Sequence, residues 1–127
     1  MKIRNSYGIF TGYLQIKELL SKGIEGFKAV HIFEQKENLG SSKNEYFIIC
    51  EMFKHFERSI VTEDDNVFSP NFIEYMDRCL DQFKDDQSVA RIAGYLLPGK
   101  WNMHGSNIMK MPLGWCWGVG IWKDRWI

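Results

Sequence analysis

The clearest candidates for chemistry are three consecutive carboxylates and an amide, Glu63-Asp64-Asp65-Asn66, near the middle of the 127-residue chain. They follow Ser59–Thr62, a short run with β-branched residues that predicts a buried strand. Ser69 and Pro70 then have the types expected at the N-cap and first position of a helix. The carboxylates are therefore expected at the carboxyl end of a strand, where open α/β sheets bind ligands.

A divalent cation would relieve the repulsion among these carboxylates, since like charges side by side disfavour ionisation. Mg²⁺ and Mn²⁺ prefer hard oxygen ligands and are commonly held by one or two carboxylates together with substrate phosphates. The pattern thus favours a metal site that carries a diphosphate. A solvated acidic turn without any ligand is the alternative, and the sequence leaves both open.

The overall composition excludes several classes of protein. Hydrophobic residues make up 45% and charged residues 25% of the chain, which is ordinary for one globular domain. Sixteen basic residues balance sixteen acidic ones, so there is no global positive field to attract nucleic acid. No apolar run is long enough for a membrane span.

The three cysteines, Cys50, Cys79 and Cys116, are far apart and lack CxxC spacing. This argues against a disulfide framework or a zinc site and fits a reducing compartment. We therefore expect a soluble, cytoplasmic protein that is able to work at the inner face of a membrane.

The elements that must position the carboxylates follow from hydrophobic periodicity. Helical spacing extends from Ile9 to Leu20, from Ser41 or Ser42 to about His55, and from about Pro70 to Phe83. Strand-like runs cover Phe27–Phe33 and Val89–Tyr95. Alternating strands and helices predict parallel βαβ units with right-handed crossovers.

Two further segments could contact a ligand. Asn38 and Gly40 lie in a turn before a helix, whose N-terminus can face a phosphate or a sugar, although a plain loop–helix junction explains them equally well. Four of the five tryptophans lie in the segment 114–126. They suggest either an aromatic platform for a sugar ring or a core-packing helix. The irregular segment 100–111, with His104 as a lesser candidate ligand or base, is expected to cover the site.

Three segments in this order carry a resemblance to a known family. They are Glu37–Gly40 before a helix, Ile60–Asp65 with Ser69–Phe72 and Ile92–Tyr95 after it, and Gly114–Gly118 with Trp122–Trp126. From about Phe27 onward the chain resembles nucleotide-sugar glycosyltransferases of GT-A fold, particularly bacterial family 2-like enzymes. It also resembles the N-acetylglucosaminyltransferase group with Glu-Asp-Asp in place of Asp-x-Asp.

The resemblance implies an α/β fold, a partial GT-A (Rossmann-like) αβα sandwich with a mostly parallel sheet. Residues 1–127 would form a single partial domain. Such enzymes usually begin with a long apolar strand that binds the nucleobase, and nothing before Ile9 supplies one. They also usually continue beyond the tryptophan-rich segment. The first nucleotide-binding strand and the C-terminal part are therefore expected to be missing.

The implied reaction is metal-dependent transfer of a sugar from a nucleoside diphosphate sugar to a glycan or polysaccharide acceptor. Asp65 would bind the cofactor, Mn²⁺ or Mg²⁺. Glu63 and Asp64 would contact the donor, as would Asn38 and Gly40.

The tryptophan-rich segment completes the implied site. Trp115 and Trp117 would border the donor-sugar or acceptor pocket. Asp124 is the late carboxylate available as a catalytic base, although a surface ion pair with its neighbours Lys123 and Arg125 explains it as well.

Two other functions stay open. The chain could be a non-catalytic remnant of such an enzyme that acts as an interaction module, or a metal-dependent phosphoryl-transfer enzyme. An incomplete sheet would also leave unpaired strand edges, which predicts self-association.

Overall fold

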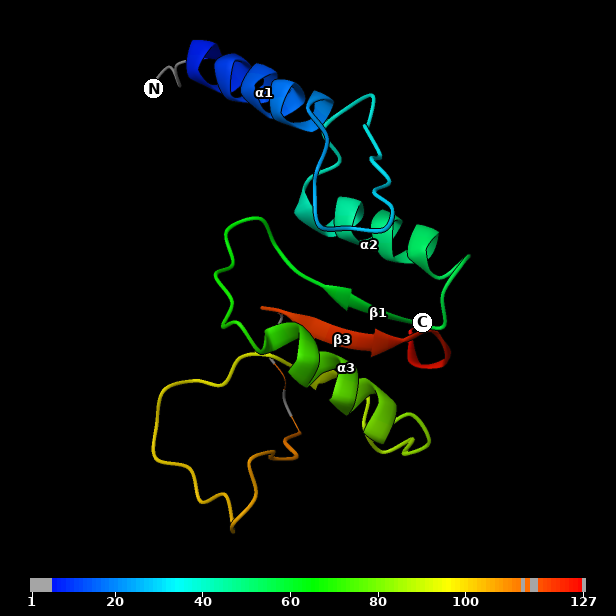
Figure 1. Cartoon of the computed structure of the whole chain (residues 1–127), viewed down its shortest axis with the longest axis vertical. Coiled ribbons are helices and arrows are strands. Elements are labelled where there is room, and N and C mark those ends of the chain that lie inside the picture. Colours follow the sequence, from blue (N-terminus) through cyan, green and yellow to red (C-terminus); the bar gives the residue numbers. More distant parts are fainter. Residues whose placement is uncertain (1–5, 113, 115–116, 127) are drawn as a thin grey trace. The chain divides into compact units, whose positions relative to one another are not determined.

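We describe the protein from a computed structural model that covers residues 6–112, 114 and 117–126, with side chains from residue 12 onward. The chain divides into two compact units, residues 1–36 and 37–127. Figure 1 shows the elements of both units along the chain. In the described part of the chain, no helix has the length and hydropathy needed to cross a membrane.

The first unit consists of helix α1, Ser6–Ser21, and an irregular segment after it. The carboxylate of Glu34 ties this segment back to the helix, because it accepts a hydrogen bond from Tyr13 Oη at 2.5 Å and pairs with Lys17 Nζ at 2.8 Å. The strand predicted over Phe27–Phe33 is wrong: these residues are irregular and exposed, with Phe27 70% accessible. A strand needs a neighbour for its backbone groups, and the described part of this unit contains no other strand.

Within the described residues of the second unit, three strands form one sheet in the order β1-β3-β2. Strand β1 spans Arg58–Val61, β2 spans Ile92–Ala93 and β3 spans Val119–Trp122. β3 pairs antiparallel with both neighbours, with Val119 opposite Val61 on one side and Ala93 on the other. The predicted Rossmann-like sandwich with a mostly parallel sheet is therefore wrong. β1 and β2 run in the same direction, but β3 lies between them.

The central strand of the sheet lies in the tryptophan-rich segment, for which the sequence suggested an aromatic platform or a core-packing helix. The spacing of its tryptophans also fits a helix, but the segment forms β3 and a short 3₁₀ helix, η1, at Lys123–Arg125. Val119, Ile121 and Trp122 favour an extended chain because β-branched and aromatic side chains fit a pleated surface. All four residues of β3 are buried, as expected for a central strand covered on both faces.

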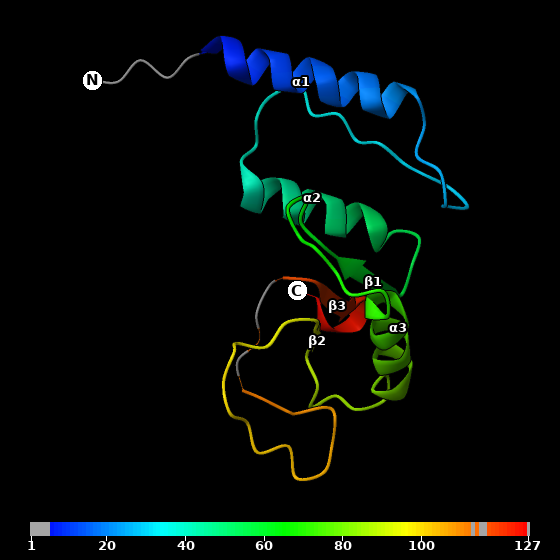
Figure 2. The ribbon, with the colours of Figure 1, turned by 60° about the vertical axis from the view of Figure 1, so that its left-hand side comes forward.

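Two helices cover the two faces of the sheet (Figure 2). Helix α2, Ser41–Met52, places Ile49 against Val119 and Ile121, together with Phe53 just after the helix. Helix α3, Phe72–Gln82, packs on the opposite face against Ile92 and Trp122; its buried residues are Phe72, Met76, Cys79 and Leu80. Alternate residues of β3 thus serve two separate cores, which follows from the two-residue period of a strand.

A hydrogen-bonded turn follows α3. Asp86 Oδ1 accepts hydrogen bonds from the backbone N–H of Ser88 at 3.0 Å and from its hydroxyl at 2.5 Å. Lys110 Nζ pairs with Asp86 Oδ2 at 2.9 Å. The hydrogen bonds from Ser88, followed by the one from Lys110, lower the pKa of Asp86 to about 2.

This shift predicts a pH-dependent contribution to stability. Because the folded-state pKa lies below the ordinary value of about 3.9, the contribution is present above pH 4 and is lost as the pH falls toward 2. We expect Asp86→Asn to be destabilised at pH 6 and to approach the parent protein at pH 2. Urea unfolding across this range measures the difference. Asp85→Asn, which changes the adjacent exposed carboxylate, serves as the control. An Asp86→Asn difference that is constant with pH would contradict the prediction.

Candidate functional site

The three consecutive carboxylates form a tight turn directly after β1. Asn66 closes this turn, because its Oδ1 accepts a hydrogen bond from Glu63 N at 3.2 Å and its backbone N–H donates to Glu63 O at 3.4 Å. Asn66 Nδ2 also donates to Asp65 Oδ1 at 3.2 Å. Glu63, Asp64 and Asp65 are exposed and form no ion pair with any described residue. We call residues 63–66 the acidic turn.

The strand register brings an aromatic pair to the same end of the sheet as the acidic turn. Beyond the pairing of Ala93 with Val119, Gly94 N donates to Gly118 O at 2.8 Å. One residue further, the rings of Tyr95 and Trp117 meet edge to face with centroids 4.9 Å apart. Since the end of β1 pairs with the start of β3, the acidic turn and the aromatic pair lie at the same end of the sheet. Trp117 remains 46% exposed and available to a ligand.

Two phenylalanines fix the loop after the acidic turn against β3. Phe68 and Phe72 stack with centroids 4.0 Å apart, and both rings pack on the backbone of Gly118. A Cβ at Gly118 would lie 2.9 Å from the Phe72 ring, and its φ of +69° also favours glycine. The acidic turn is therefore held between β1 and a packed aromatic anchor.

Helix α3 begins slightly later than the sequence predicts. Ser69 and Pro70 precede it, and Asn71 occupies the N-cap position. Ser69 Oγ donates to Asn71 Oδ1 at 2.8 Å instead of capping a backbone N–H.

Asn38 and Gly40 lie immediately before α2. Asn38 Oδ1 accepts a hydrogen bond from Gly40 N at 2.8 Å, and Gly40 has a φ of +74°. No side chain caps the first turn of α2. The helix begins at the same end of the sheet at which β1 ends (Figures 1 and 2), so its N-terminus lies toward the acidic turn.

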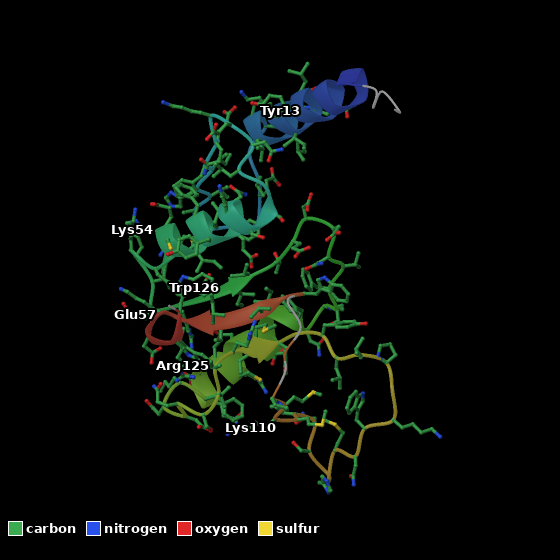
Figure 3. The ribbon with its side chains drawn as sticks, turned by 180° about the vertical axis from the view of Figure 1, so that it is seen from behind. Tyr13, Lys54, Glu57, Lys110, Arg125 and Trp126 are labelled. Atoms are coloured by element: carbon green, nitrogen blue, oxygen red, sulfur yellow. The ribbon has the colours of Figure 1, made fainter. Side chains whose placement is uncertain are left out.

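The structure does not bring Asp124 to this end of the sheet. Asp124 lies in η1, where its Oδ2 accepts a hydrogen bond from Gln87 Nε2 at 3.1 Å. Figure 3 shows the neighbouring Arg125 and Glu57 at the opposite end of the sheet, where β3 finishes. Asp124 lies seven positions after Trp117 along mostly extended chain, or roughly 20 Å away at about 3.3 Å per residue. Trp115, the other tryptophan predicted to border the ligand, lies outside the described residues.

A pocket of about 520 Å³ runs along the outer edge of β2. The segment 107–112 lines one side, and residues 88–96 line the other. Tyr75 reaches into it from α3 and donates its hydroxyl to Ala93 O at 3.2 Å. Burial raises the pKa of Tyr75 to about 12, so this hydroxyl stays a donor at neutral pH. The pocket reaches Tyr95 and therefore adjoins the aromatic pair.

The carboxylates of the acidic turn could ligate a metal ion that arrives bound to a substrate phosphate. They do not form a site in which protein side chains alone would surround the metal. No group of three or more histidine, cysteine, aspartate or glutamate side chains that could hold a metal ion occurs among the residues the structure describes. One or two exposed carboxylates with phosphate oxygens completing the shell are, however, the usual arrangement for Mg²⁺.

Sequence reasoning gave Tyr95 no site role. Its place opposite Trp117 depends on the pairing of β2 with β3, and two residues of strand give no sequence signal for that register. Comparisons with protein-family models, curated proteins and solved structures found no match.

Proposed function

We propose that the second unit binds a nucleoside diphosphate sugar through a divalent metal at the acidic turn, and that the protein transfers the sugar to a glycan acceptor. The observation that carries the proposal is the strand register, which brings exposed carboxylates and an exposed tryptophan to the same end of the sheet. Carboxylates suit a metal–diphosphate, and aromatic faces suit a sugar ring. The antiparallel sheet is not an argument for this function.

In this proposal Asp65 holds Mn²⁺ or Mg²⁺ against the diphosphate, while Glu63 and Asp64 contact the ribose or the donor sugar. The metal stabilises the negative charge that develops on the leaving diphosphate. Asn66 orients Asp65 through the hydrogen bond from its amide. The uncapped start of α2, after Asn38 and Gly40, lies toward the same anion.

Trp117, which is 46% exposed and contacts Tyr95 edge to face, would pack against the sugar. Asp124 has no part in the proposal, because it lies at the opposite end of β3. We place the activity in the cytoplasm, where the protein would also be able to work at the inner face of the membrane. Cys50 and Cys79 are free thiols, which fits a reducing compartment.

Thermal unfolding with Mn²⁺ plus UDP, and separately plus GDP, tests the donor site. Ligand at a hundred times its dissociation constant should stabilise the folded protein by about 2.7 kcal/mol. Asp65→Asn should abolish this stabilisation, because it removes the charge while its amide oxygen can still accept the hydrogen bond from Asn66. Asp85→Asn, an exposed carboxylate beyond the far end of α3, is the matched control and should respond like the parent protein.

The outcome also separates the proposal from its alternative, a non-catalytic interaction module. The exposure of Glu63, Asp64 and Asp65 also suits this alternative, since no described basic side chain pairs with these carboxylates. No stabilisation with either nucleotide, or equal stabilisation of the Asp65→Asn variant, would overturn the donor site and favour the module. Metal-dependent stabilisation lost only in Asp65→Asn would support the transferase and justify a screen of sugar donors with glycan acceptors.

A further inference from the structure

Strand β1 presents an unpaired edge. The hydrogen bond from Lys123 N to Glu57 O, at 2.9 Å, marks Glu57 as a residue bonded to the β3 side. Because bonded and non-bonded positions alternate along an antiparallel strand, Ser59 and Val61 also face β3. Arg58, Ile60 and Thr62 then direct their backbone N–H and C=O groups outward. Among the described residues these outward groups have no hydrogen-bond partner.

The opposite edge of the sheet is partly covered. In β2 the hydrogen bond from Gly94 N to Gly118 O shows that Gly94 faces β3, so Ala93 faces outward. The Tyr75 hydroxyl donates to the outward carbonyl of Ala93. The segment 107–112 lies across the pocket on this side. Among the described residues, the sheet therefore has one partly covered edge, at β2, and one open edge, at β1.

β1 is short, with four residues, but it contains no lysine, proline or bulge, three of the features that usually prevent an edge strand from pairing. Its one charged side chain, Arg58, pairs with Asp77 at 2.8 Å and with Asp81 at 3.7 Å, both on α3. These ion pairs hold the guanidinium against the face of the sheet and leave the edge clear.

We propose that β1 pairs antiparallel with β1 of a second copy of this chain, which joins two three-stranded sheets into one. In one register, the outward backbone N–H and C=O groups of each copy meet those of the other. This register places Ile60 opposite the partner's Ile60 and Arg58 opposite the partner's Thr62. Between residues 58 and 62 no two like charges face each other, and a two-fold axis makes both halves identical. Just beyond this stretch Glu57, which pairs with Lys123 of its own chain at 3.1 Å, lies opposite the partner's Glu63. The formal net charge of zero removes long-range repulsion between copies.

Sedimentation equilibrium of the full chain over a range of concentrations, with amide hydrogen exchange at each concentration, tests this interface. We expect a monomer–dimer equilibrium. The Ile60 amide should exchange at least about tenfold more slowly in the dimer, whereas the amides of Ser59 and Val61, already bonded to β3, should be protected at every concentration.

Thr62→Pro provides the matching variant, because it removes an outward N–H that β3 does not use and obstructs the partner strand. It should weaken dimerisation at least about tenfold, whereas Thr62→Val, which keeps the N–H, should dimerise like the parent. A chain that stays monomeric, a dimer in which Ile60 exchanges freely, or a folded Thr62→Pro variant that dimerises normally would each overturn the proposal. If Thr62→Pro does not fold, the exchange of Ile60 alone decides.

Discussion

Replacing Trp122 with alanine should lower the free energy of unfolding by about 3–5 kcal/mol. The side chain is 4% exposed, and its Nε1 donates to Leu80 O at 3.1 Å, which joins β3 to α3. The Arg125 guanidinium lies over the indole, 3.9 Å from the ring centroid. The substitution would therefore create a cavity, leave a buried carbonyl unpaired and remove the surface on which Arg125 packs. Urea unfolding monitored by far-UV circular dichroism measures the effect.

Trp101→Ala is the matched control, because its indole Nε1 also donates to a backbone carbonyl, that of Leu97, at 2.9 Å. Trp101 is 41% exposed, so its loss should cost less than about 1 kcal/mol. Equal effects of the two substitutions would show that Trp122 is not part of a packed core.

Arg125 explains why the loss of Trp122 should extend beyond one side chain. Its Nη1 donates to Val89 O at 2.7 Å and to Phe83 O at 3.2 Å, and its Nη2 donates to Lys84 O. These bonds tie the turn after α3 to η1. Arg125 Nε is buried and makes no hydrogen bond with the described residues, although it lies 3.7 Å from Asp124 Oδ2. The indole of Trp122 covers the guanidinium, so its loss would expose this group.

Replacing Leu80 with alanine should cost about 2–5 kcal/mol, the range for a buried leucine whose surroundings relax only in part. Leu80 is 2% exposed and lies over Gly120 of β3. A Cβ at Gly120 would meet three Leu80 side-chain atoms at 3.1–3.2 Å. Gly120→Ala alone should therefore also destabilise, by about 1–3 kcal/mol, through overpacking.

The double variant Leu80→Ala/Gly120→Ala tests this contact directly. The new methyl group at position 120 would occupy part of the space vacated by Leu80. We expect the double variant to be more stable than the sum of the two single effects, by about 0.5–3 kcal/mol. Strictly additive effects in a thermodynamic cycle of urea unfolding experiments would show that the two sites do not share this space.

Local sequence patterns located much of the secondary structure. The helix predicted to start at Ser41 or Ser42 begins at Ser41, and the strand before the acidic turn spans Arg58–Val61. The helix predicted from Pro70 begins at Phe72, since Asn71 provides the N-cap. These elements carry signals within a few residues of themselves, namely apolar periodicity and turn residues.

The sheet could not be predicted in the same way. The order β1-β3-β2 depends on a strand of four residues that pairs with two segments distant in sequence. The helix-like spacing of the tryptophans competed with the strand propensity of Val119 and Ile121, and burial between two helices favoured the strand. Tertiary packing, which no local window contains, decided the topology.

In the candidate site, too, the features set by adjacent residues could be predicted, whereas those set by strand pairing could not. The acidic turn was recognisable because its residues are adjacent, and the structure places it after β1 as expected. The pairing of Trp117 with Tyr95 and the distance of Asp124 from this end of the sheet both depend on where β3 starts and ends. Their roles in sugar transfer stay predictions.

The position of β3 in the chain has a consequence for biosynthesis. β3 is the central strand of the sheet, yet it follows β1 by about sixty residues. Until β3 has been synthesised, β1 and β2 have no neighbouring strand among the described residues, and the apolar faces of α2 and α3 lack part of the sheet surface that they cover. This unit must therefore fold after its synthesis, through contacts of high sequence separation, which makes folding slow. The nascent chain would expose strand edges and apolar side chains meanwhile, so its yield in cells should depend on chaperones.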